Sequence, residues 1–519
     1  MQQNKKVQFL KLTIFFLISL LLMQWIFPPK KEITNEEKTQ QIEKKVEVIR
    51  NPISFQNKFL KGEFDINNAR LDSVLLKDIY KTSKKEENIS LINNDFFVEF
   101  GFLGDEKIKS STAKKWKKIS SDSNQIILQQ IVKNLKYEIK FLTKDNHILS
   151  VEQRVKNTGS NAEKVWAYGR LVNKTIPNSG YVHQGWTGYL GGDFTDYDID
   201  DLQEQNEKIA NATGWFGWTN HYTQTILKTD AIAPTVNFSA TEIESQADFQ
   251  TKEIILNSGD SKTVFTKIYA GPKQENVLLI AEKEGFEFLS KSIDYGWLFV
   301  ISKPLAQGLH WLGKLLGNMG WAIILLTLLI RLALYPLSKK SLVAMAKMKD
   351  LQPKIKALQA KFASNKIKLQ QEMMKLYKTN KVSPAGGCVP MLLQVPIFFA
   401  LYRVLMVSFD LRQAGFLYIK DLSQADPTSL FNLFGAIPFA VPEWLPAVGI
   451  LPILMGLAMW VQQKIQGTTS TAPKNKIMSY LPIIFVLMFG GLPAGLVLYW
   501  MMSNVFSLAQ TYIIQRNMD

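Results

Sequence analysis

The sequence predicts a polytopic α-helical membrane protein that carries a large all-β domain outside the cytoplasm. Three observations predict this class. A mean hydropathy of −0.03 over 519 residues fits a mixture of soluble and membrane parts. Apolar runs gather at the N-terminus and again after residue 319, and 319–338 is long enough to cross a bilayer. The residues between these regions alternate between apolar and polar, which is typical of β-strands.

The N-terminus predicts an uncleaved transmembrane anchor over 1–28. Two lysines precede an apolar run from Val7 to Phe27, which ends in Pro28-Pro29 without a small-residue cleavage pattern. The lysines place the N-terminus in the cytoplasm. Residues 29–57 are rich in Lys, Glu, Gln and Asn, which predicts a flexible linker.

The all-β domain is predicted over 58–290. Segments such as Tyr137–Phe141 and Thr263–Tyr269 alternate, and Gly, Asn, Asp and Ser turns separate them, which favours a β-sandwich. A domain of roughly 220 residues can bury its own core. Because the single cysteine of the chain, Cys388, lies outside this domain, packing alone must stabilise it.

An amphipathic helix is predicted over 291–318. Apolar residues recur at helical spacing from Trp297 to Leu316, and Trp297 and Trp311 are typical of a membrane interface. The alternative is an ordinary helix that packs against a domain.

Five further crossings follow the anchor and bring the total to six. Their prolines and glycines are tolerated in spanning helices when neighbouring helices satisfy the backbone. The predicted spans are 319–338, 388–409, 448–462, 477–491 and 493–514.

Charge predicts how these crossings are oriented. Twelve lysines against Asp350 and Glu372 give 339–387 a net charge of +10, whereas 410–445 carries −2. The positive-inside rule then places 339–387 and the lysine-bearing loop 463–476 in the cytoplasm. Both termini are therefore cytoplasmic and the β-domain is periplasmic.

The segment 341–380 predicts an antiparallel helical hairpin. Leu, Met and Ile recur at three- and four-residue steps on two arms, with lysines outside. A solvated basic loop is one interpretation. The other is docking to anionic phospholipid, ribosomal RNA or a targeting factor. The lysines that would dock are Lys347, Lys349, Lys354, Lys356 and Lys361.

Arg331 is the most informative residue because it lies in the apolar run 319–338. Such a charge costs about 2.5–3.5 kcal/mol on insertion scales and indicates a functional site. Lys339, which marks the membrane surface, is about 12 Å further along the helix. The side chain of Arg331 therefore cannot easily extend to the interface, as charged side chains near helix ends do. Other polar or amphipathic residues of the crossings gather toward the same side, and they are Thr327, Gln394, Tyr499, Trp500 and Ser503. They predict a wet groove in the inner leaflet. Interhelical hydrogen bonding alone is the alternative.

Catalytic patterns are missing from the sequence. The crossings contain no histidine and no carboxylate pair, and no phosphate-binding glycine loop or nucleophile elbow occurs. The four histidines lack metal-ligand spacing. His183 and His221 could suggest a sugar-active site, but no motif surrounds them. We therefore expect no enzyme activity, no metal and no cofactor.

Several motifs resemble the YidC family of membrane protein insertases. They occur in order and densely over 290–515, while the β-domain is similar more weakly to the family's periplasmic β-supersandwich. The motifs are Asp294–Trp297, Arg331–Leu337, Leu351–Ile355, Gln371–Tyr377, Gly386–Pro390, Gln394–Phe398, Ile450–Gly456 and Pro493–Trp500.

The resemblance implies that 319–515 is an insertase core and that the chain inserts inner-membrane proteins, alone or with the Sec translocon. It assigns the groove arginine to Arg331, the groove threonine to Thr327 and the substrate-contacting aromatic to Trp500. Nascent membrane proteins, the Sec translocon and the ribosome or signal-recognition-particle pathway would be partners. An apolar substrate segment would slide out near Val395, Pro396 and Phe398, which are the slide residues.

The sequence departs from the family at two places. The stretch 428–447 is longer than in other members, and its apolar character predicts that it dips into the outer interface. The tail after Ile514 lacks a basic extension, so a ribosome contact would have to use the hairpin.

Two other functions compete with the insertase. A small-solute transporter would need polar residues through the full membrane depth, whereas here they gather toward one side. A membrane-tethered carbohydrate enzyme would need only one anchor.

Overall fold

The structure is a computed structural model, and it describes most of the chain from residue 51 onward. The described residues are 51–82, 85–104, 116–122, 124–175, 182–363, 365–380, 389–435, 437, 448–466 and 476–516. The chain divides into two compact units, 1–294 and 295–519. The predicted anchor over 1–28 and most of the predicted linker lie outside the described residues, as does much of 428–447.

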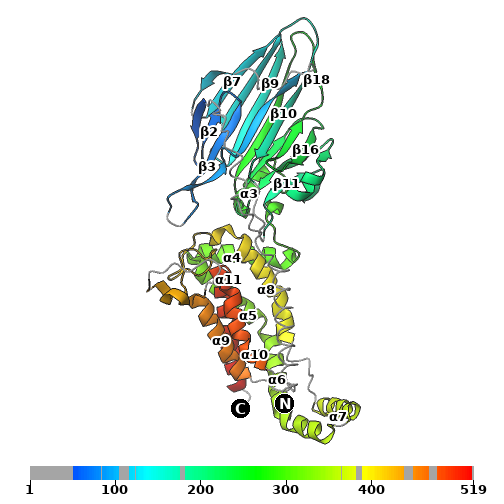
Figure 1. The fold of residues 1–519 in the computed structure, drawn as a ribbon, viewed down its shortest axis with the longest axis vertical. Helices are drawn as coiled ribbons and strands as arrows, with labels where there is room; N and C mark the ends of the chain where they lie inside the picture. The colour runs from blue at the N-terminus through cyan, green and yellow to red at the C-terminus, as the bar shows by residue number, and fades with distance from the viewer. Residues whose placement is uncertain are drawn as a thin grey trace. The chain divides into compact units, whose positions relative to one another are not determined.

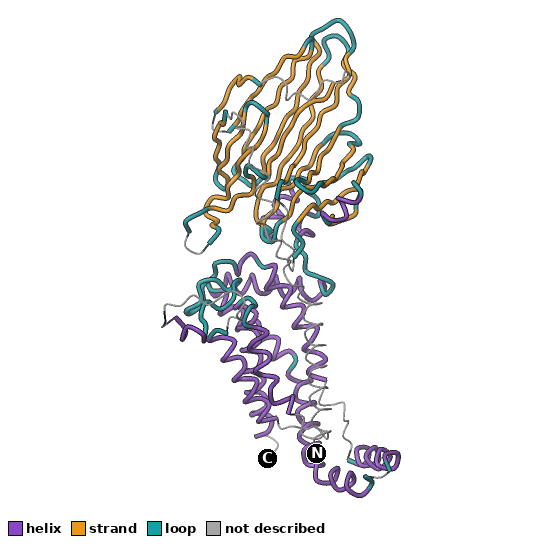
Figure 2. Tube along the Cα trace, in the orientation of Figure 1, coloured by secondary structure: helices purple, strands orange, loops and turns teal. Residues whose placement is uncertain are grey.

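The first unit consists of two antiparallel sheets (Figures 1 and 2). In the first sheet β4 (Asn88–Ile92) pairs with β3, β18 (Ile254–Leu256) pairs with β10, and the other strands follow one order. That order is β1 (Pro52–Gln56), β2 (Leu60–Asp65), β3 (Arg70–Tyr80), β5 (Phe96–Gly104), β10 (Glu163–Asn173), β17 (Ser245–Gln250), β16 (Thr235–Ala240) and β13 (Glu207–Ile209). The second sheet has the order β12 (Asp193–Tyr197), β11 (Gly185–Leu190), β14 (Gly214–Thr219), β15 (Thr223–Thr229), β19 (Ser261–Pro272), β9 (Ile148–Asn157), β8 (Leu135–Thr143), β7 (Gln125–Val132) and β6 (Lys117–Ser121).

Alternation along the strands builds the core of this sandwich. In β8 the buried residues are Leu135, Tyr137, Ile139 and Phe141, at every second position. The ring of Phe141 lies 3.8 Å from that of Phe64 in the first sheet, so the two inner faces interdigitate. The β-sandwich predicted from period-two alternation is confirmed.

One buried amide also joins the two sheets. Gln153 of β9 is fully buried, and its Nε2 donates to the carbonyl oxygens of Gly101 at 2.9 Å and Tyr168 at 3.0 Å. Both acceptors belong to the first sheet. Two satisfied hydrogen bonds across an apolar core fix how the sheets are registered.

The domain starts earlier than the predicted boundary at residue 58. Residues 52–56, which were assigned to the linker, form β1, in which Phe55 is buried and pairs with Gly62 of β2. A Cβ at Gly62 would lie 2.3 Å from the carbonyl oxygen of Ser73 and 2.6 Å from the Phe55 ring. The lysine- and glutamate-rich composition upstream hides the short alternation of Ile53 and Phe55.

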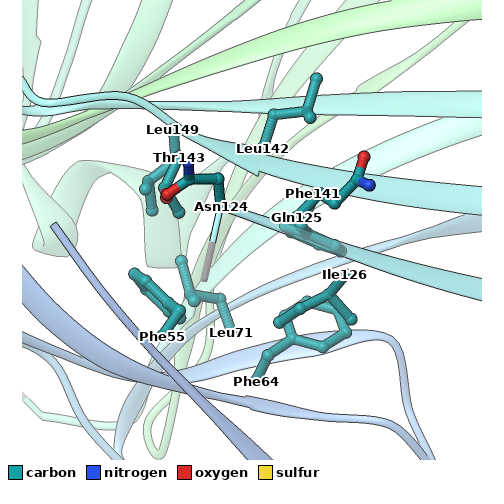
Figure 3. Close-up of a pocket in the computed structure, with 10 residues that line it drawn as sticks. All are labelled: Phe55, Phe64, Leu71, Asn124, Gln125, Ile126, Phe141, Leu142, Thr143 and Leu149. Atoms are coloured by element: carbon teal, nitrogen blue, oxygen red, sulfur yellow. The ribbon is translucent and has the colours of Figure 1, made fainter. Parts of the chain in front are cut away.

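A small cavity lies between the sheets. Phe55, Phe64 and Leu71 of the first sheet face Ile126 and Phe141 of the second (Figure 3). Its volume is about 10 Å³, so at most one water molecule fits. This space is a packing defect in an apolar core and has no room for a sugar.

Short helices complete the first unit. They are α2 (Ile199–Glu204), α3 (Glu275–Lys283) and η3 (Leu289–Ser292). The indole nitrogen of Trp215 donates to the carbonyl oxygen of Glu287 at 2.8 Å, which ties the segment between α3 and η3 to the second sheet.

The second unit is helical. Helices occur where the sequence predicts helical segments, the antiparallel hairpin stays a prediction, and the 3₁₀ turns η5 (Phe409–Leu411) and η6 (Leu430–Gly435) follow α8. The helices are α4 (Phe299–Leu316), α5 (Met319–Ala333), α6 (Tyr335–Lys361), α7 (Lys366–Thr379), α8 (Val389–Val407), α9 (Ile450–Gln466), α10 (Lys476–Phe489) and α11 (Ala494–Arg516).

Helix α4 is amphipathic, as 291–318 predicts. Leu309 and Leu312 are buried, while Trp311 and Leu315 are exposed on the other side. His310 Nδ1 lies 2.5 Å from Asp410 Oδ2, which connects α4 to η5. Whether α4 lies on a membrane surface stays a prediction.

The predicted crossing 319–338 is broken. Helix α5 ends at Ala333, and α6 starts at Tyr335 with Pro336 in its first turn, at an angle of 61°. Proline lacks an N–H and clashes with the carbonyl four residues earlier, so the first helix cannot continue.

No single helix among the described residues is both long and apolar enough to cross a membrane, but the bent pair 319–333 and 335–344 is. Gln394–Val407, Ile450–Ile465 and Tyr480–Phe489 are shorter apolar helices. The count of six crossings is therefore not confirmed and stays a prediction.

The half-buried ring of His147 predicts a pH-dependent stability of the β-domain. It stacks on Phe59 with a ring separation of 4.7 Å, and burial lowers its pKa from 6.5 to about 4. Between these pH values the His147 ring therefore binds a proton in the unfolded chain but not in the folded chain. Stability is full above pH 6.5 and falls as the pH drops toward 4, by roughly 1–3 kcal/mol.

Protection factors from hydrogen exchange of the full-length protein, corrected for intrinsic rates, measure this loss in β9. His147→Gln should remove most of the difference between pH 7.5 and pH 5. Equal pH dependence in both proteins would show that other groups dominate.

Candidate functional site

The site is built around α11 and begins with the way α5 presents Arg331. The side chain of Asn318 caps α5 by accepting from the backbone N–H groups of Gly320 at 2.9 Å and Trp321 at 3.2 Å. Arg331 lies in the last turn of the same helix, where the dipole favours a cation. The apolar face of α5 and its terminus therefore place one charge beside α11.

The guanidinium of Arg331 is directed at α11. Its Nε donates to Ser503 Oγ at 3.1 Å, and Nη2 contacts the same oxygen. The carbonyl oxygen of Arg331 accepts from Gln510 Nε2 at 3.0 Å. Both ends of the residue are thus bonded to α11, and the predicted pair Arg331 and Ser503 lies together.

Two further hydrogen bonds reach α11 from other helices. Gln394 Nε2 of α8 donates to the hydroxyl of Tyr499 at 2.7 Å. Gln462 Nε2 of α9 donates to Ser507 Oγ at 3.1 Å. Tyr499, Ser503 and Ser507 follow one another at four-residue steps, so they form one polar stripe on α11. We call these three residues the polar stripe.

Ser507 and Gln510 are absent from the residues predicted for the groove. Both lie in an otherwise apolar helix, and Ser507 continues the four-residue spacing of Tyr499 and Ser503. That spacing is the signal that could have found it.

Thr327 is buried, and its hydroxyl donates to the carbonyl oxygen of Ile323 at 2.6 Å. The single hydroxyl hydrogen of Thr327 is therefore donated within α5. Thr327 is thus buried, whereas Arg331, four residues later on α5, is half-buried.

Trp500 belongs to an aromatic cluster. Its ring lies 4.5 Å from Phe398 of α8, in an edge-to-face arrangement, and 5.3 Å from Phe489 and 5.8 Å from Phe485, both of α10. Three helices meet at this cluster. Its indole N–H is buried without an acceptor among the described residues.

The other two slide residues, Val395 and Pro396, precede Phe398 on α8. Val395 is exposed, and Pro396 lies inside α8 half-buried. Phe398 is therefore the slide residue that the structure brings to Trp500.

The hairpin arms pack through apolar side chains. Leu351 and Ile355 of α6 and Tyr377 of α7 are buried together. Between the arms lies a cavity of about 410 Å³, lined by Leu358 and Leu376 and by several charged side chains. Of the predicted docking lysines, Lys347, Lys354, Lys356 and Lys361 are exposed, while the side chain of Lys349 lies outside the described residues.

The histidines of the β-domain form no metal centre in the described ranges. His183 Nε2 lies 3.1 Å from the carbonyl oxygen of Trp186, and His221 stacks on Tyr222. Within those ranges no group of three or more His, Cys, Asp or Glu residues could hold a metal ion.

Comparisons with known proteins match almost the whole chain. The family model described as YidC periplasmic domain matches residues 52–307, and the model described as 60Kd inner membrane protein matches 311–519. A membrane protein insertase YidC from Ruegeria sp. (strain TM1040) is 33% identical and covers 88% of this chain and 82% of its own. One from Rickettsia canadensis is 32% identical and covers 89% and 87%.

Solved structures are also similar to this chain, at lower sequence identity. A crystal structure of an active YidC insertase is 21% identical, with a TM-score of 0.39 over 89% of this chain and 92% of its own. A galactose mutarotase-like protein from Lactobacillus casei is 11% identical, with a TM-score of 0.33 over 42% of this chain and all of its own.

The hydrogen bond between Gln394 and Tyr499 should couple α8 to α11. In a double-mutant cycle of Gln394→Leu and Tyr499→Phe, the two changes should share about 0.6–2 kcal/mol of unfolding free energy in detergent, the range for interhelical hydrogen bonds. Gln394→Leu with Ser507→Ala is the matched control, since no bond joins that pair. Strict additivity in the first cycle would contradict the geometry.

Proposed function

The chain belongs to the YidC family of membrane protein insertases, and we propose that it inserts proteins through a polar groove that Arg331 lines. Two family models that together extend from residue 52 to the end, and relatives of 32–33% identity, support the membership. It is an inner-membrane insertase with a periplasmic domain. Insertases bind and transfer their clients without covalent chemistry, which agrees with the missing catalytic patterns.

We propose the topology from charge. The segment 339–387 carries +10 and contains the hairpin, so it lies in the cytoplasm. Six crossings with both termini in the cytoplasm then place the domain 58–290, extended to residue 52, in the periplasm. The β-domain would connect through the interfacial helix to the insertase core 319–515.

The single observation that supports the proposed groove is that Arg331 has more hydrogen-bond donors than there are described acceptors around it. A guanidinium has five N–H groups, and Ser503 Oγ is its only side-chain acceptor among the described residues. The remaining N–H groups could donate hydrogen bonds to carboxylate or carbonyl oxygens of a client. Arg331 would attract the acidic tail of a nascent protein and lower the free-energy cost of its partial transfer.

The aromatic cluster around Trp500 would lie where a client segment leaves the groove for the lipid. An apolar client segment would leave along Val395, Pro396 and Phe398, past Trp500. Burial of about 20 apolar residues in lipid drives this step, so no nucleotide is required.

The polar groups favour an insertase over a transporter. The described hydrogen bonds to α11 from α5, α8 and α9 involve residues 499–510, while Ala494–Leu498 at its start is apolar and buried. A solute pathway would need polar groups along the whole helix.

Partners follow from the family and from the hairpin. We propose nascent membrane proteins as clients, with the Sec translocon and the ribosome or signal-recognition-particle pathway as partners. The exposed lysines of the hairpin would bind anionic phospholipid or a targeting factor.

Reconstitution tests the function and the role of Arg331 together. Liposomes with the purified protein should insert a single-span client with a short acidic tail above the level of empty liposomes. Arg331→Ala should reduce this insertion about tenfold, equivalent to about 1.4 kcal/mol, and affect a neutral-tailed client less. Arg403→Ala is the matched control, because Arg403 is also an arginine in a helix of the core.

Absence of insertion above empty liposomes would refute the function. Equal loss for acidic and neutral tails would refute the electrostatic role of Arg331 and leave the function standing.

The hairpin lysines should bind anionic lipid. In nanodiscs, phosphatidylglycerol should increase the hydrogen-exchange protection of 341–380 relative to phosphatidylcholine alone, since each lysine near such a surface contributes about 1 kcal/mol. Changing Lys347, Lys354, Lys356 and Lys361 together to Glu should abolish the increase. The corresponding Arg variant should keep it, and loss of protection in that variant would argue against a charge effect.

A further inference from the structure

A compact apolar turn protrudes after α8. Five large apolar side chains within eight residues are between 41% and 56% exposed. They are Leu430, Phe431, Leu433, Phe434 and Ile437. We call these five residues the apolar tip. Single exposed apolar residues are ordinary, but a contiguous group marks an interaction surface.

The backbone of the apolar tip keeps these side chains outward. Leu433 and Phe434 both have left-handed φ angles, 49° and 58°, which large side chains rarely adopt. Internal hydrogen bonds hold this shape, from Phe434 N–H to the Ser429 carbonyl at 2.7 Å and from Ile437 N–H to the Asn432 carbonyl at 3.1 Å. Because these backbone groups are bonded internally, the free-energy cost of moving the turn into the membrane interface is smaller.

Polar groups support the apolar tip. We call Tyr418, Asp426, Thr428 and Leu451, which are joined by hydrogen bonds, the base. Asp426 is buried, and its carboxylate accepts from the Tyr418 hydroxyl at 2.7 Å, the Thr428 N–H at 2.9 Å and the Leu451 N–H at 2.8 Å. The last of these bonds caps α9. Gly449 makes room for the carboxylate, because a Cβ there would lie 2.4 Å from Asp426 Cγ.

This base places the apolar tip at one end of the helix bundle. The N–H of Leu430 donates to the Val448 carbonyl at 2.8 Å, immediately before α9. The N–H of Ala494, the first residue of α11, donates to the Gln424 carbonyl at 2.7 Å. The apolar tip therefore lies at the N-terminal ends of α9 and α11, which the proposed topology places at the periplasmic surface.

We propose that the apolar tip inserts into the periplasmic leaflet of the lipid bilayer and anchors the outer ends of α9 and α11 there. The inference goes beyond insertion activity and rests on the proposed function only for the orientation of the helices. Lipid is the occupant that the chemistry fits, since no Asp, Glu, Lys or Arg occurs from 427 to 442.

Two features favour lipid over a protein partner. Protein interfaces usually carry a polar rim, whereas 427–442 contains no charged residue and only Thr428, Ser429 and Asn432 as polar side chains. Leu454 and Leu457, in the first two turns of α9, are exposed apolar side chains as well. Apolar contacts of this kind hold interfacial segments at the boundary between the lipid headgroups and the acyl chains.

A fluorophore measures the depth of the apolar tip directly. The single cysteine allows a Cys388→Ser background, in which Leu433→Cys or Phe431→Cys carries a polarity-sensitive label. Lys420→Cys, an exposed charged position before Asp426, is the control. The full chain is reconstituted into liposomes of phosphatidylethanolamine and phosphatidylglycerol with lipids spin-labelled near the headgroup.

At positions 431 and 433 we expect blue-shifted emission, at least twofold stronger quenching by the spin-labelled lipid than at 420, and at least twofold weaker quenching by aqueous iodide. Labels at 431 and 433 that iodide reaches as well as at 420 would overturn the proposal. Shielding that occurs in native membrane vesicles but not in the liposomes would overturn it in favour of a protein partner. No client is added, so failure here is separate from failure of insertion.

Discussion

Hydrogen bonding of α11 to three neighbouring helices is the interaction on which the helical unit depends. In lipid, apolar side chains gain little from contacting one another, because the lipid tails are equally apolar, so polar bonds and close packing must select the arrangement. Tyr499, Ser503 and Ser507 bond to α8, α5 and α9 respectively. The same stripe that holds the helices also holds the charge of Arg331, so stability and the proposed groove share their residues.

The β-domain reaches stability by a different route. Two antiparallel sheets share one apolar core, in which aromatic side chains such as Phe64, Phe141 and Phe100 meet across the interface. Gln153 adds a polar connection that only one registration of the sheets satisfies. The space described between the sheets has a volume of only about 10 Å³, so a ligand larger than a water molecule does not fit there.

Sequence patterns predicted the β-sandwich and located most helices to within a few residues, because burial on one face imposes a visible period. They did not reveal β1, whose two apolar residues lie next to a charged stretch. They also treated Tyr335-Pro336 as part of one crossing, although Pro336 starts a new helix. For the site, composition indicated Arg331 and Ser503, but it could not show that the Thr327 hydroxyl bonds to its own helix, since rotamers depend on packing.

The break between α5 and α6 gives Arg331 a mechanical position. Carbonyls in the last turn of a helix lack partners within that helix, and the Arg331 carbonyl is satisfied instead by Gln510 of α11. Four residues later the chain bends by 61° into the hairpin arm. The arm therefore starts within about one helical turn of Arg331, so a change in the direction of the arm would act on the backbone next to the residue that is hydrogen-bonded to α11.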